Sequence, residues 1–267
     1  MKRYVWLTDL HLNFPGLEPP AKFLDRVAAL ETDGVLLGGD VSEWPDCPNY
    51  LRMMAERLAQ PIYFVLGNHD YYFSSIATVR GYMERLCEEA PRLVWLPRSA
   101  PIELAPGVGL IGHDGWADGR LGDYWRSLVM LNDYRLITEL SALDKAARLE
   151  KLHQLGDETA AHIRRELPEA LERFDQVVFL THVPPFREAC WYDGRISNDE
   201  WLPHFTCRAA GEALRDIMSA NPAKQLTVLC GHTHGAGEAR ILPNLHAITG
   251  GAQYGAPEIQ RVFEWKA

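Results

Sequence analysis

Gly67-Asn68-His69-Asp70 is a polar cluster at the end of an apolar run, and this arrangement is the key to the fold. The cluster directly follows residues 61–66 (PIYFVL), an apolar run with the length of one β-strand. An amide, an imidazole and a carboxylate at the end of a buried strand are unfavourable unless hydrogen bonds or an ion satisfy them. We therefore expect these side chains to serve a binding site.

Four other apolar runs end in the same way, with Asp or His shortly after the run. They are residues 4–8 with Asp9 and His11, residues 34–37 with Asp40, residues 176–181 with His182, and residues 226–230 with His232 and His234. In open α/β sheets the ligand crevice lies beyond the carboxyl ends of the strands. Five runs that end in Asp, Asn or His therefore predict one shared metal site.

Stretches with helical spacing of apolar residues lie between the first strand-like runs. Their apolar positions are Phe23, Leu24, Val27 and Leu30; Leu51, Met54 and Leu58; and Ile76, Val79, Met83 and Leu86. Strands that alternate with helices of this length predict an α/β fold with a mostly parallel sheet. Residues 93–96 and 102–104 are expected as short edge strands, residues 108–111 as a further strand, and residues 245–249 and 259–265 as a closing antiparallel pair.

The regular alternation ends near residue 112. Residues 112–142 are rich in Trp, Tyr, Asp and Arg without a clear period, and residues 143–174 are charged with helical spacing. We expect two helices there, divided at Gly156-Asp157, with His153 and His162 on the surface. We interpret residues 1–267 as a single domain, with insertions at about 112–174 and 184–207 that flank the cleft.

Composition limits the possible partners. The net charge of −9 argues against broad nucleic-acid binding, which needs a Lys and Arg footprint. No apolar run approaches the ~20 residues of a membrane helix, and no signal segment precedes the first strand. The five cysteines form no C-x-x-C pair. We expect a soluble, cytoplasmic protein with buried thiols and no membrane partner.

The residue types at the strand ends indicate the metals. Imidazoles, two carboxylates and one amide suit Mn, Fe, Zn or Co and disfavour Cu(I) and iron–sulfur clusters. Seven ligands exceed what one ion needs, so we expect two divalent or trivalent ions, most readily Mn, Fe or Zn, with Asp40 as the bridge. Two such ions about 3.5–4 Å apart polarise phosphate oxygens and lower the pKa of a bridging water. The sequence thus predicts hydrolysis of a phosphoester bond in a small phosphorylated substrate, through in-line attack by a metal-bridging hydroxide.

The ordered motifs resemble the calcineurin-like metallophosphoesterase superfamily. They are Asp9-x-His11, Gly38-Gly39-Asp40, Gly67-Asn68-His69-Asp70, Thr181-His182 and Gly231-His232-x-His234. The resemblance implies an α/β fold of four layers, an α/β/β/α sandwich. Its two mixed sheets have mostly parallel cores, and helical and loop insertions lie over the active site.

The resemblance also implies a role for each residue. One metal would be held by Asp9, His11, Asp40 and His234, and the other by Asp40, Asn68, His182 and His232. His69 would face the phosphate as a catalytic residue and stabilise the transition state or protonate the leaving oxygen. Asp70 would orient His69 and favour its imidazolium form.

One branch of the superfamily is not expected. Protein serine/threonine phosphatases carry a Gly-Asp-x-x-x-Arg-Gly pattern, whereas Asp40 is followed here by Val-Ser-Glu-Trp-Pro. Monoesters and diesters both remain possible substrates, and a nuclease or a catalytically silent interaction scaffold of the same fold are the alternatives. The identity of the metals and the oligomeric state are also left open.

Substrate contacts are expected near the insertions. His113 ends a predicted strand, so it is either a substrate contact or a histidine that supports the site from behind. Arg187 lies in the second insertion, where a guanidinium can grip a phosphate through its planar fork. The aromatic residues of both insertions could stack a base, but core or lid packing is the preferred interpretation.

Overall fold

Two β-sheets form the centre of the computed structural model, which describes residues 1–16 and 18–266. The first sheet has the strand order β13-β1-β2-β3-β4. Its strands are β1 (Lys2–Leu7), β2 (Gly34–Leu37), β3 (Ile62–Phe64), β4 (Leu93–Trp95) and β13 (Arg261–Trp265). β1 to β4 pair in parallel, and β13 pairs antiparallel with β1.

The second sheet has the strand order β11-β12-β10-β7-β6-β5. Its strands are β5 (Ile102–Ala105), β6 (Val108–His113), β7 (Gln176–Thr181), β10 (Gln225–Cys230), β11 (Gly237–Leu242) and β12 (Leu245–Thr249). β6, β7, β10 and β12 pair in parallel, and the edge strands β5 and β11 pair antiparallel with their neighbours.

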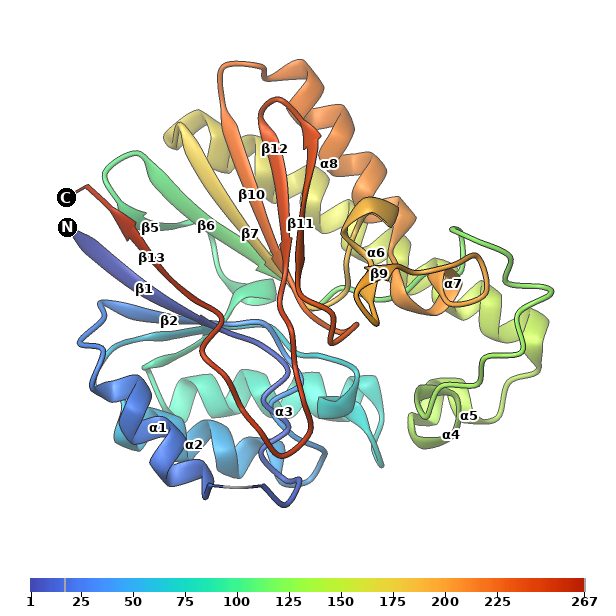
Figure 1. Cartoon of the computed structure of the whole chain (residues 1–267), viewed down its shortest axis with the longest axis horizontal. Coiled ribbons are helices and arrows are strands. Elements are labelled where there is room, and N and C mark those ends of the chain that lie inside the picture. The colour runs from blue at the N-terminus through green and yellow to red at the C-terminus, as the bar shows by residue number, and fades with distance from the viewer. Residues whose placement is uncertain (17, 267) are drawn as a thin grey trace.

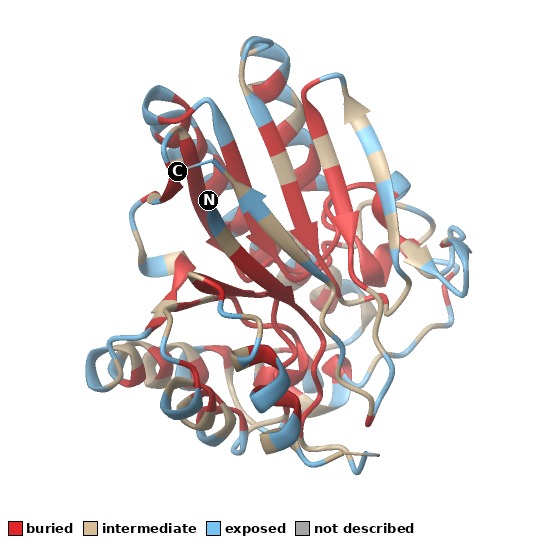
Figure 2. Ribbon diagram, turned by 60° about the vertical axis from the view of Figure 1, so that its left-hand side comes forward, coloured by how far each residue is buried: buried red, intermediate tan, exposed pale blue. Residues whose placement is uncertain are grey.

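Helices cover the outer face of each sheet (Figure 1). α1 (Pro20–Ala28), α2 (Cys47–Arg57) and α3 (Ile76–Glu89) pack on the first sheet, and α6 (Lys145–Arg173) and α8 (Arg208–Ala220) pack on the second. Because both faces of each sheet are covered, the central strands are continuous apolar runs rather than alternating ones. Figure 2 shows that these strands are largely buried. The predicted four-layer α/β/β/α sandwich is confirmed.

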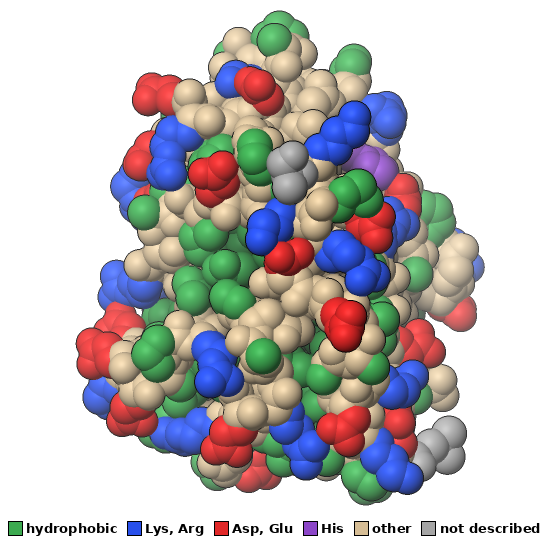
Figure 3. Space-filling view, turned by 90° about the vertical axis from the view of Figure 1, so that its left-hand side faces the viewer, with side chains coloured by type: hydrophobic (Ala, Val, Ile, Leu, Met, Phe, Trp, Pro, Cys, Tyr) green, Lys and Arg blue, Asp and Glu red, His purple; other side chains and the backbone are tan. Residues whose placement is uncertain are grey.

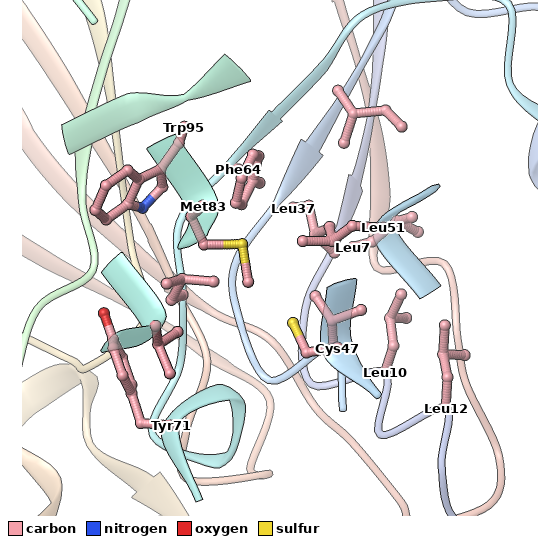
Figure 4. Close-up of a cluster of buried hydrophobic side chains, with 14 of the residues drawn as sticks. Leu7, Leu10, Leu12, Leu37, Cys47, Leu51, Phe64, Tyr71, Met83 and Trp95 are labelled. Atoms are coloured by element: carbon pink, nitrogen blue, oxygen red, sulfur yellow. The ribbon is translucent and has the colours of Figure 1, made fainter. Parts of the chain in front are cut away.

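An apolar cluster lies between each pair of adjacent layers. Side chains such as Leu7, Phe64 and Met83 join the first sheet to its helices (Figure 4). Trp6 and Leu180 belong to the cluster between the two sheets. The third cluster joins the second sheet to α6 and α8. With both sheets held rigidly in this way, the loops at their strand ends have fixed positions.

Short elements make up the insertions and the loops around the strand ends. They are the 3-10 turns η1 (His69–Tyr71), η2 (Leu96–Arg98) and η3 (Arg187–Ala189), the helices α4 (Asp133–Leu136), α5 (Thr138–Ser141) and α7 (Leu202–Phe205), and the strands β8 (Trp191–Tyr192) and β9 (Arg195–Ile196).

Two predictions about the second half of the chain are wrong. Residues 245–249 and 259–265 do not pair with each other, because β12 lies in the second sheet and β13 in the first. Gly156 does not divide the charged region, since α6 is one continuous helix. A Cβ at Gly156 would lie 2.5 Å from Cβ of Asp118, so glycine permits close packing of this helix.

The same helix corrects the prediction for His162. This side chain is only 5% exposed, because it lies on the face of α6 that packs on the second sheet. On the molecular face shown in Figure 3, basic and acidic side chains are interspersed. In the part of the chain that the structure describes, none of the helices combines the length and apolarity needed to cross a bilayer.

Candidate metal centre

The loops that follow the parallel strands meet in the middle of the molecule (Figure 1). Backbone hydrogen bonds connect them: the Asp9 N–H donates to Gly39 O at 3.0 Å and the His11 N–H donates to Asp40 O at 3.0 Å. The Gly231 N–H donates to His182 O at 2.8 Å. These backbone bonds alone fix the positions of the loops within each sheet.

The backbone is strained at five of the seven predicted ligands. Their positive φ angles are 51° at Asp9, 45° at His11, 50° at Asp40, 69° at His232 and 58° at His234. A non-glycine residue at positive φ is uncommon and costs of order 1–3 kcal/mol, and such residues cluster at functional sites. The fold thus holds these side chains in conformations that local preference disfavours.

Two glycines make room for the carboxylates. A Cβ at Gly67 would overlap the Asp40 carboxylate, and a Cβ at Gly231 would overlap the Asp9 carboxylate. Only glycine lets the backbone approach a side chain this closely. The glycines of the sequence motifs therefore have a direct steric function.

Four of the predicted ligands form a first cluster. Donor atoms of Asp9, His11, Asp40 and His234 all lie within 4.8 Å of one another. Nε2 of His11 is 3.0 Å from Nε2 of His234, and Asp9 Oδ1 is 3.6 Å from the same His234 atom. The cluster therefore offers two carboxylates and two imidazoles to one point, a donor set that suits a divalent transition metal.

The other predicted ligands form a second cluster around Asn68. Its Oδ1 lies 2.9 Å from Nδ1 of His232 and 3.1 Å from Nε2 of His182. Asp40 Oδ2 lies 3.4 Å from Nε2 of His182 and 3.8 Å from Nε2 of His11. One carboxylate oxygen thus faces both clusters, as the sequence predicts for a bridge.

Neighbouring groups orient the ligand atoms. Nδ1 of His182 faces Gly38 O at 2.9 Å, so this nitrogen carries a proton and the other ring nitrogen, Nε2, is the one that faces Asn68 and Asp40. Nε2 of His232 faces His204 O at 3.1 Å, which leaves Nδ1 free. Asp40 Oδ1 accepts the His69 N–H at 2.8 Å, which leaves Oδ2 for the site.

The protonation of the buried groups fits cation binding. Burial lowers the pKa of His11 to about 2 and that of His232 to about 3, so both rings are neutral ligands. Burial also lowers the pKa of His182, but the Asp40 carboxylate outweighs it and raises this pKa to about 10. A proton on His182 then balances buried negative charge. A metal ion bound to this donor set would supply that positive charge in place of the proton.

Asp133 is a site residue that the sequence did not reveal. Its Oδ1 accepts hydrogen bonds from Asn68 Nδ2 at 2.9 Å and from the Tyr72 hydroxyl at 2.8 Å. This contact holds the amide so that Asn68 Oδ1 faces the histidines. Asp133 begins α4 inside the first insertion, where no strand end or spacing marks it, and its only sequence signal is an acidic residue among aromatic ones.

His69 lies beside the two clusters. Its Nε2 is 4.0 Å from Asp40 Oδ2, and its Nδ1 is 3.8 Å from Glu43 Oε1. Burial by itself lowers the pKa of His69, but the carboxylates of Asp40 and Glu43 outweigh it, so the pKa is raised above its ordinary value. A protonated imidazole at the edge of the site can donate to an oxygen of a bound phosphate.

The position of Asp70 differs from the predicted role. Its Oδ1 accepts the backbone N–H groups of Val41 at 3.0 Å and Ser42 at 3.1 Å, and its Oδ2 accepts that of Gly67 at 2.8 Å. Among the described residues, no hydrogen bond or ion pair joins it to His69. Burial and the nearby Asp40 raise the pKa of Asp70 to about 7. Asp70 therefore joins the loops after β2 and β3 rather than orienting the imidazole.

A cavity of about 280 Å³ lies over the two clusters, and we refer to it as the metal cavity. Segments far apart in the sequence contribute to its wall, including the predicted insertions. The lining residues are Asp40, Asn68, His69, Tyr72, Leu131, Asn132, Asp133, Tyr192, Phe205, His232, Thr233, His234 and Tyr254. Within the described chain, this set contains four aromatic side chains and no Lys or Arg.

The two predicted substrate contacts lie outside this wall. His113 is buried in a second cavity, beside α6, with its ring centre 4.9 Å from that of His162. Arg187 is on the surface, where its Nη2 is 2.8 Å from Asp199 Oδ1. The sequence placed both near a strand end or insertion, but it does not encode on which side of the sheet a side chain lies.

Comparison with known proteins agrees with this geometry. Residues 2–236 match the profile of the calcineurin-like phosphoesterase family. A phosphopantetheinyl hydrolase from Mycobacterium tuberculosis has a similar structure, with a TM-score of 0.64, 18% identity, and coverage of 95% of this chain and 90% of that one. A dimetal phosphatase from Danio rerio aligns with a TM-score of 0.56, 12% identity, and coverage of 94% and 87%. No curated protein sequence matches the chain.

The chain belongs to the calcineurin-like phosphoesterase family, because the family match covers most of its length. It is a metal-dependent hydrolase of phosphoesters. The superfamily resemblance read from the motifs is therefore confirmed.

Proposed function

We propose that this protein is a phosphodiesterase that uses two metal ions. Asp9, His11, Asp40 and His234 would hold one ion, and Asp40, Asn68, His182 and His232 the other. When bound, the two ions would polarise the phosphate oxygens and supply a hydroxide near neutral pH. Mn, Fe or Zn suits the mixed nitrogen and oxygen donors.

The side chains around the ions have three further roles: orientation of a ligand, proton donation and positioning of loops. Asn68 presents its amide oxygen because Asp133 holds the amide nitrogen. His69 is the group that donates a proton to the departing oxygen, since its Nε2 lies beside Asp40 and Tyr254 at the cavity wall. Asp70 keeps the loops after β2 and β3 in register, so it acts as a positioning residue.

The observation that carries the diester assignment is the absence of Lys and Arg from the described wall of the metal cavity. Four carboxylates, those of Asp9, Asp40, Glu43 and Asp133, lie at or beside the site. They offset the positive charge that two divalent ions bring. A monoester carries up to two negative charges and a diester only one, so the surroundings favour the diester.

The rim of the cavity indicates the organic part of the substrate. Large apolar side chains are exposed in segments that line the cavity or adjoin its lining residues. They are Tyr192 and Tyr254, which line the cavity, and Phe73 and Met130, which are the sequence neighbours of the lining residues Tyr72 and Leu131. Exposed apolar side chains that gather around a pocket mark a binding surface. We infer that at least one ester group of the substrate is apolar or aromatic.

A pair of aryl substrates tests the proposal. We expect kcat/KM for bis(4-nitrophenyl) phosphate to exceed that for 4-nitrophenyl phosphate by at least about tenfold, the ratio that 1.4 kcal/mol produces. Asn132→Lys places a cation on the cavity wall and should shift this ratio toward the monoester, whereas Asn132→Gln should not. A higher kcat/KM for the monoester, or a ratio unchanged by Asn132→Lys, would overturn the assignment.

A further inference from the structure

A second cavity lies where the two helical layers approach each other, between α3, η2, the end of β6 and α6. Its volume is about 280 Å³, and we refer to it as the arginine pocket. It is separate in its lining from the metal cavity, with which it shares no residue. The lining residues are Arg80, Trp95, Pro97, Arg98, His113, Glu158, Ala161, His162 and Arg165.

Cations outnumber anions in this lining. Arg80, Arg98 and Arg165 face a single acidic lining residue, Glu158, whose Oε1 lies 2.6 Å from Arg80 Nη1. A guanidinium has five N–H donors, so one ion pair leaves several of them free. Arg80 Nε is buried and has no hydrogen-bond partner among the described residues, with Asp114 Oδ2 at 3.9 Å.

The two other arginines reach the pocket from its edge. Arg98 Nε contacts Glu84 Oε1 at 2.7 Å, and Arg165 Nε contacts Glu166 Oε1 at 2.7 Å. Neither glutamate belongs to the pocket lining. Each arginine therefore keeps donors available on the pocket side of its ion pair.

His162 presents a donor to the pocket. Its Nδ1 lies 3.1 Å from Arg165 Nη2, and a guanidinium can only donate, so Nδ1 is the acceptor and the neutral ring carries its proton on Nε2. Nε2 is buried, and the part of the chain that the structure describes offers it no hydrogen-bond partner. The Gly112 backbone lies near this ring and raises its pKa, but no group in the described chain forms a hydrogen bond of normal geometry with Nε2.

His113 has the same tautomer for the same reason. Its Nδ1 accepts the Gly115 N–H at 3.1 Å, which leaves the proton on Nε2. Burial is the main cause that lowers the pKa of both His113 and His162, so both rings are neutral. The pocket thus gathers N–H donors from three guanidinium groups and two imidazoles.

Such a set of donors needs an acceptor with several lone pairs and negative charge. We propose that the arginine pocket binds a phosphate-type oxyanion, either inorganic phosphate or the phosphate group of a small molecule. Its tetrahedral oxygens accept from guanidinium forks and from His162 Nε2 in charge-assisted hydrogen bonds. The small volume excludes a large organic part beyond the phosphate.

Calorimetric titration of the full-length protein with inorganic phosphate tests the proposal. Arg98→Gln with Arg165→Gln removes two pocket donors, and both side chains are exposed enough (69% and 64%) that core packing is unaffected. The matched control is Arg57→Gln with Arg164→Gln, which removes the same charge elsewhere. Arg57 is ion-paired with Asp25, and Arg164 is exposed beside Arg165.

The metal cavity can also bind phosphate, so the titration is repeated in Asp40→Asn. We expect a binding component that persists in Asp40→Asn, weakens at least about tenfold in the pocket variant and is unchanged in the control. Binding that Asp40→Asn abolishes, or that the pocket variant and the control affect equally, would overturn the proposal. A glucose 6-phosphate titration then separates the two sources: competition with phosphate shows that a sugar phosphate also fits, and its absence restricts the site to the free ion.

Discussion

The metal cavity and the arginine pocket both contain buried histidines, but the rings face their cavities with opposite hydrogen-bonding character. Nε2 of His232 faces the His204 carbonyl, so the lone pair of Nδ1 is on the side of Asn68 at the metal cavity. Nδ1 of His162 faces the Arg165 guanidinium, so the proton of Nε2 faces the arginine pocket. The partner of one ring nitrogen therefore determines what the other can bind.

Histidine can therefore serve two classes of ligand in the same fold, depending on the partner of its ring. A carbonyl or carboxylate behind the ring prepares it for a cation, and a cationic donor behind the ring prepares it for an anion. The surrounding residues agree in each case: carboxylates lie among the histidines of the metal cavity, and arginines lie among those of the arginine pocket. Substitutions in the metal cavity and in the arginine pocket test this difference.

Asp40→Asn should remove metal binding and most of the turnover. Asparagine keeps the shape of the side chain but removes the charge of the only carboxylate that faces both clusters of the described site. Because loss of a group that merely supports a ligand costs 10–100-fold, loss of this ligand should lower turnover of an aryl diester by more than about 100-fold. Metal content measured by mass spectrometry should fall as well. Asp25→Asn, at a surface ion pair, is the control, and full activity of Asp40→Asn would refute its bridging role.

His69→Gln should separate catalysis from metal binding. His69 belongs to neither cluster, so the metal content should stay at the wild-type value. The loss of a proton donor should lower kcat by about 10²–10⁴-fold. If the metal content falls together with kcat, His69 is a ligand and the assignment of its role is wrong.

Asp133→Asn should weaken the amide ligand indirectly. An asparagine at this position no longer fixes the direction of the Asn68 amide, so we expect a 10–100-fold loss of turnover and a weaker affinity for one of the two ions. Tyr72→Phe removes a hydroxyl that donates to the same oxygen of Asp133 and accepts from Asn68 Nδ2 at 3.0 Å; because this acceptor is uncharged, its loss should have a smaller effect. An equal effect of both variants, or none from Asp133→Asn, would mean that the amide is oriented by other contacts.

His162→Gln should change the pH dependence of stability rather than activity. Burial lowers the pKa of His162 in the folded state below its unfolded value of about 6.5, so the unfolded chain binds more protons in acid. Stability therefore falls as the pH drops below about 6.5, by about 1.4 kcal/mol for each pH unit that separates the two pKa values. Denaturant unfolding at pH 7 and pH 5 should show a smaller loss in His162→Gln than in wild type. His153→Gln, at a partly exposed position of the same helix, should retain the wild-type loss.

The metal cavity was largely predictable from the sequence because its determinants are local. Asp9, Asp40 and Asn68 each follow a buried strand directly, and parallel strands bring such positions to one edge. Asp133 was not predictable, since its contact with Asn68 depends on how the first insertion folds back over the site. Asp70 was misjudged for a related reason: its neighbour in sequence is His69, but its carboxylate turns to the backbone of another loop.

The positions of the strands followed the sequence, including the edge strands β4 and β5, whereas the pairing of the C-terminal strands β12 and β13 did not. Buried parallel strands such as β2 have no competing interpretation, because their apolar runs are short and bounded by glycine or polar residues. Whether β13 joins the first or the second sheet depends on contacts more than 250 residues away, such as the pairing of Lys2 with Trp265. The arginine pocket depends on such contacts too, since α3, β6 and α6 each contribute to it.

Anomalous diffraction at the manganese edge, from crystals of the full-length protein grown with Mn²⁺, locates the bound ions. We expect two peaks about 3.5–4 Å apart. One would be surrounded by Asp9, His11, Asp40 and His234, and the other by Asp40, Asn68, His182 and His232. A single peak, or peaks that lie away from Asp40, would contradict this assignment.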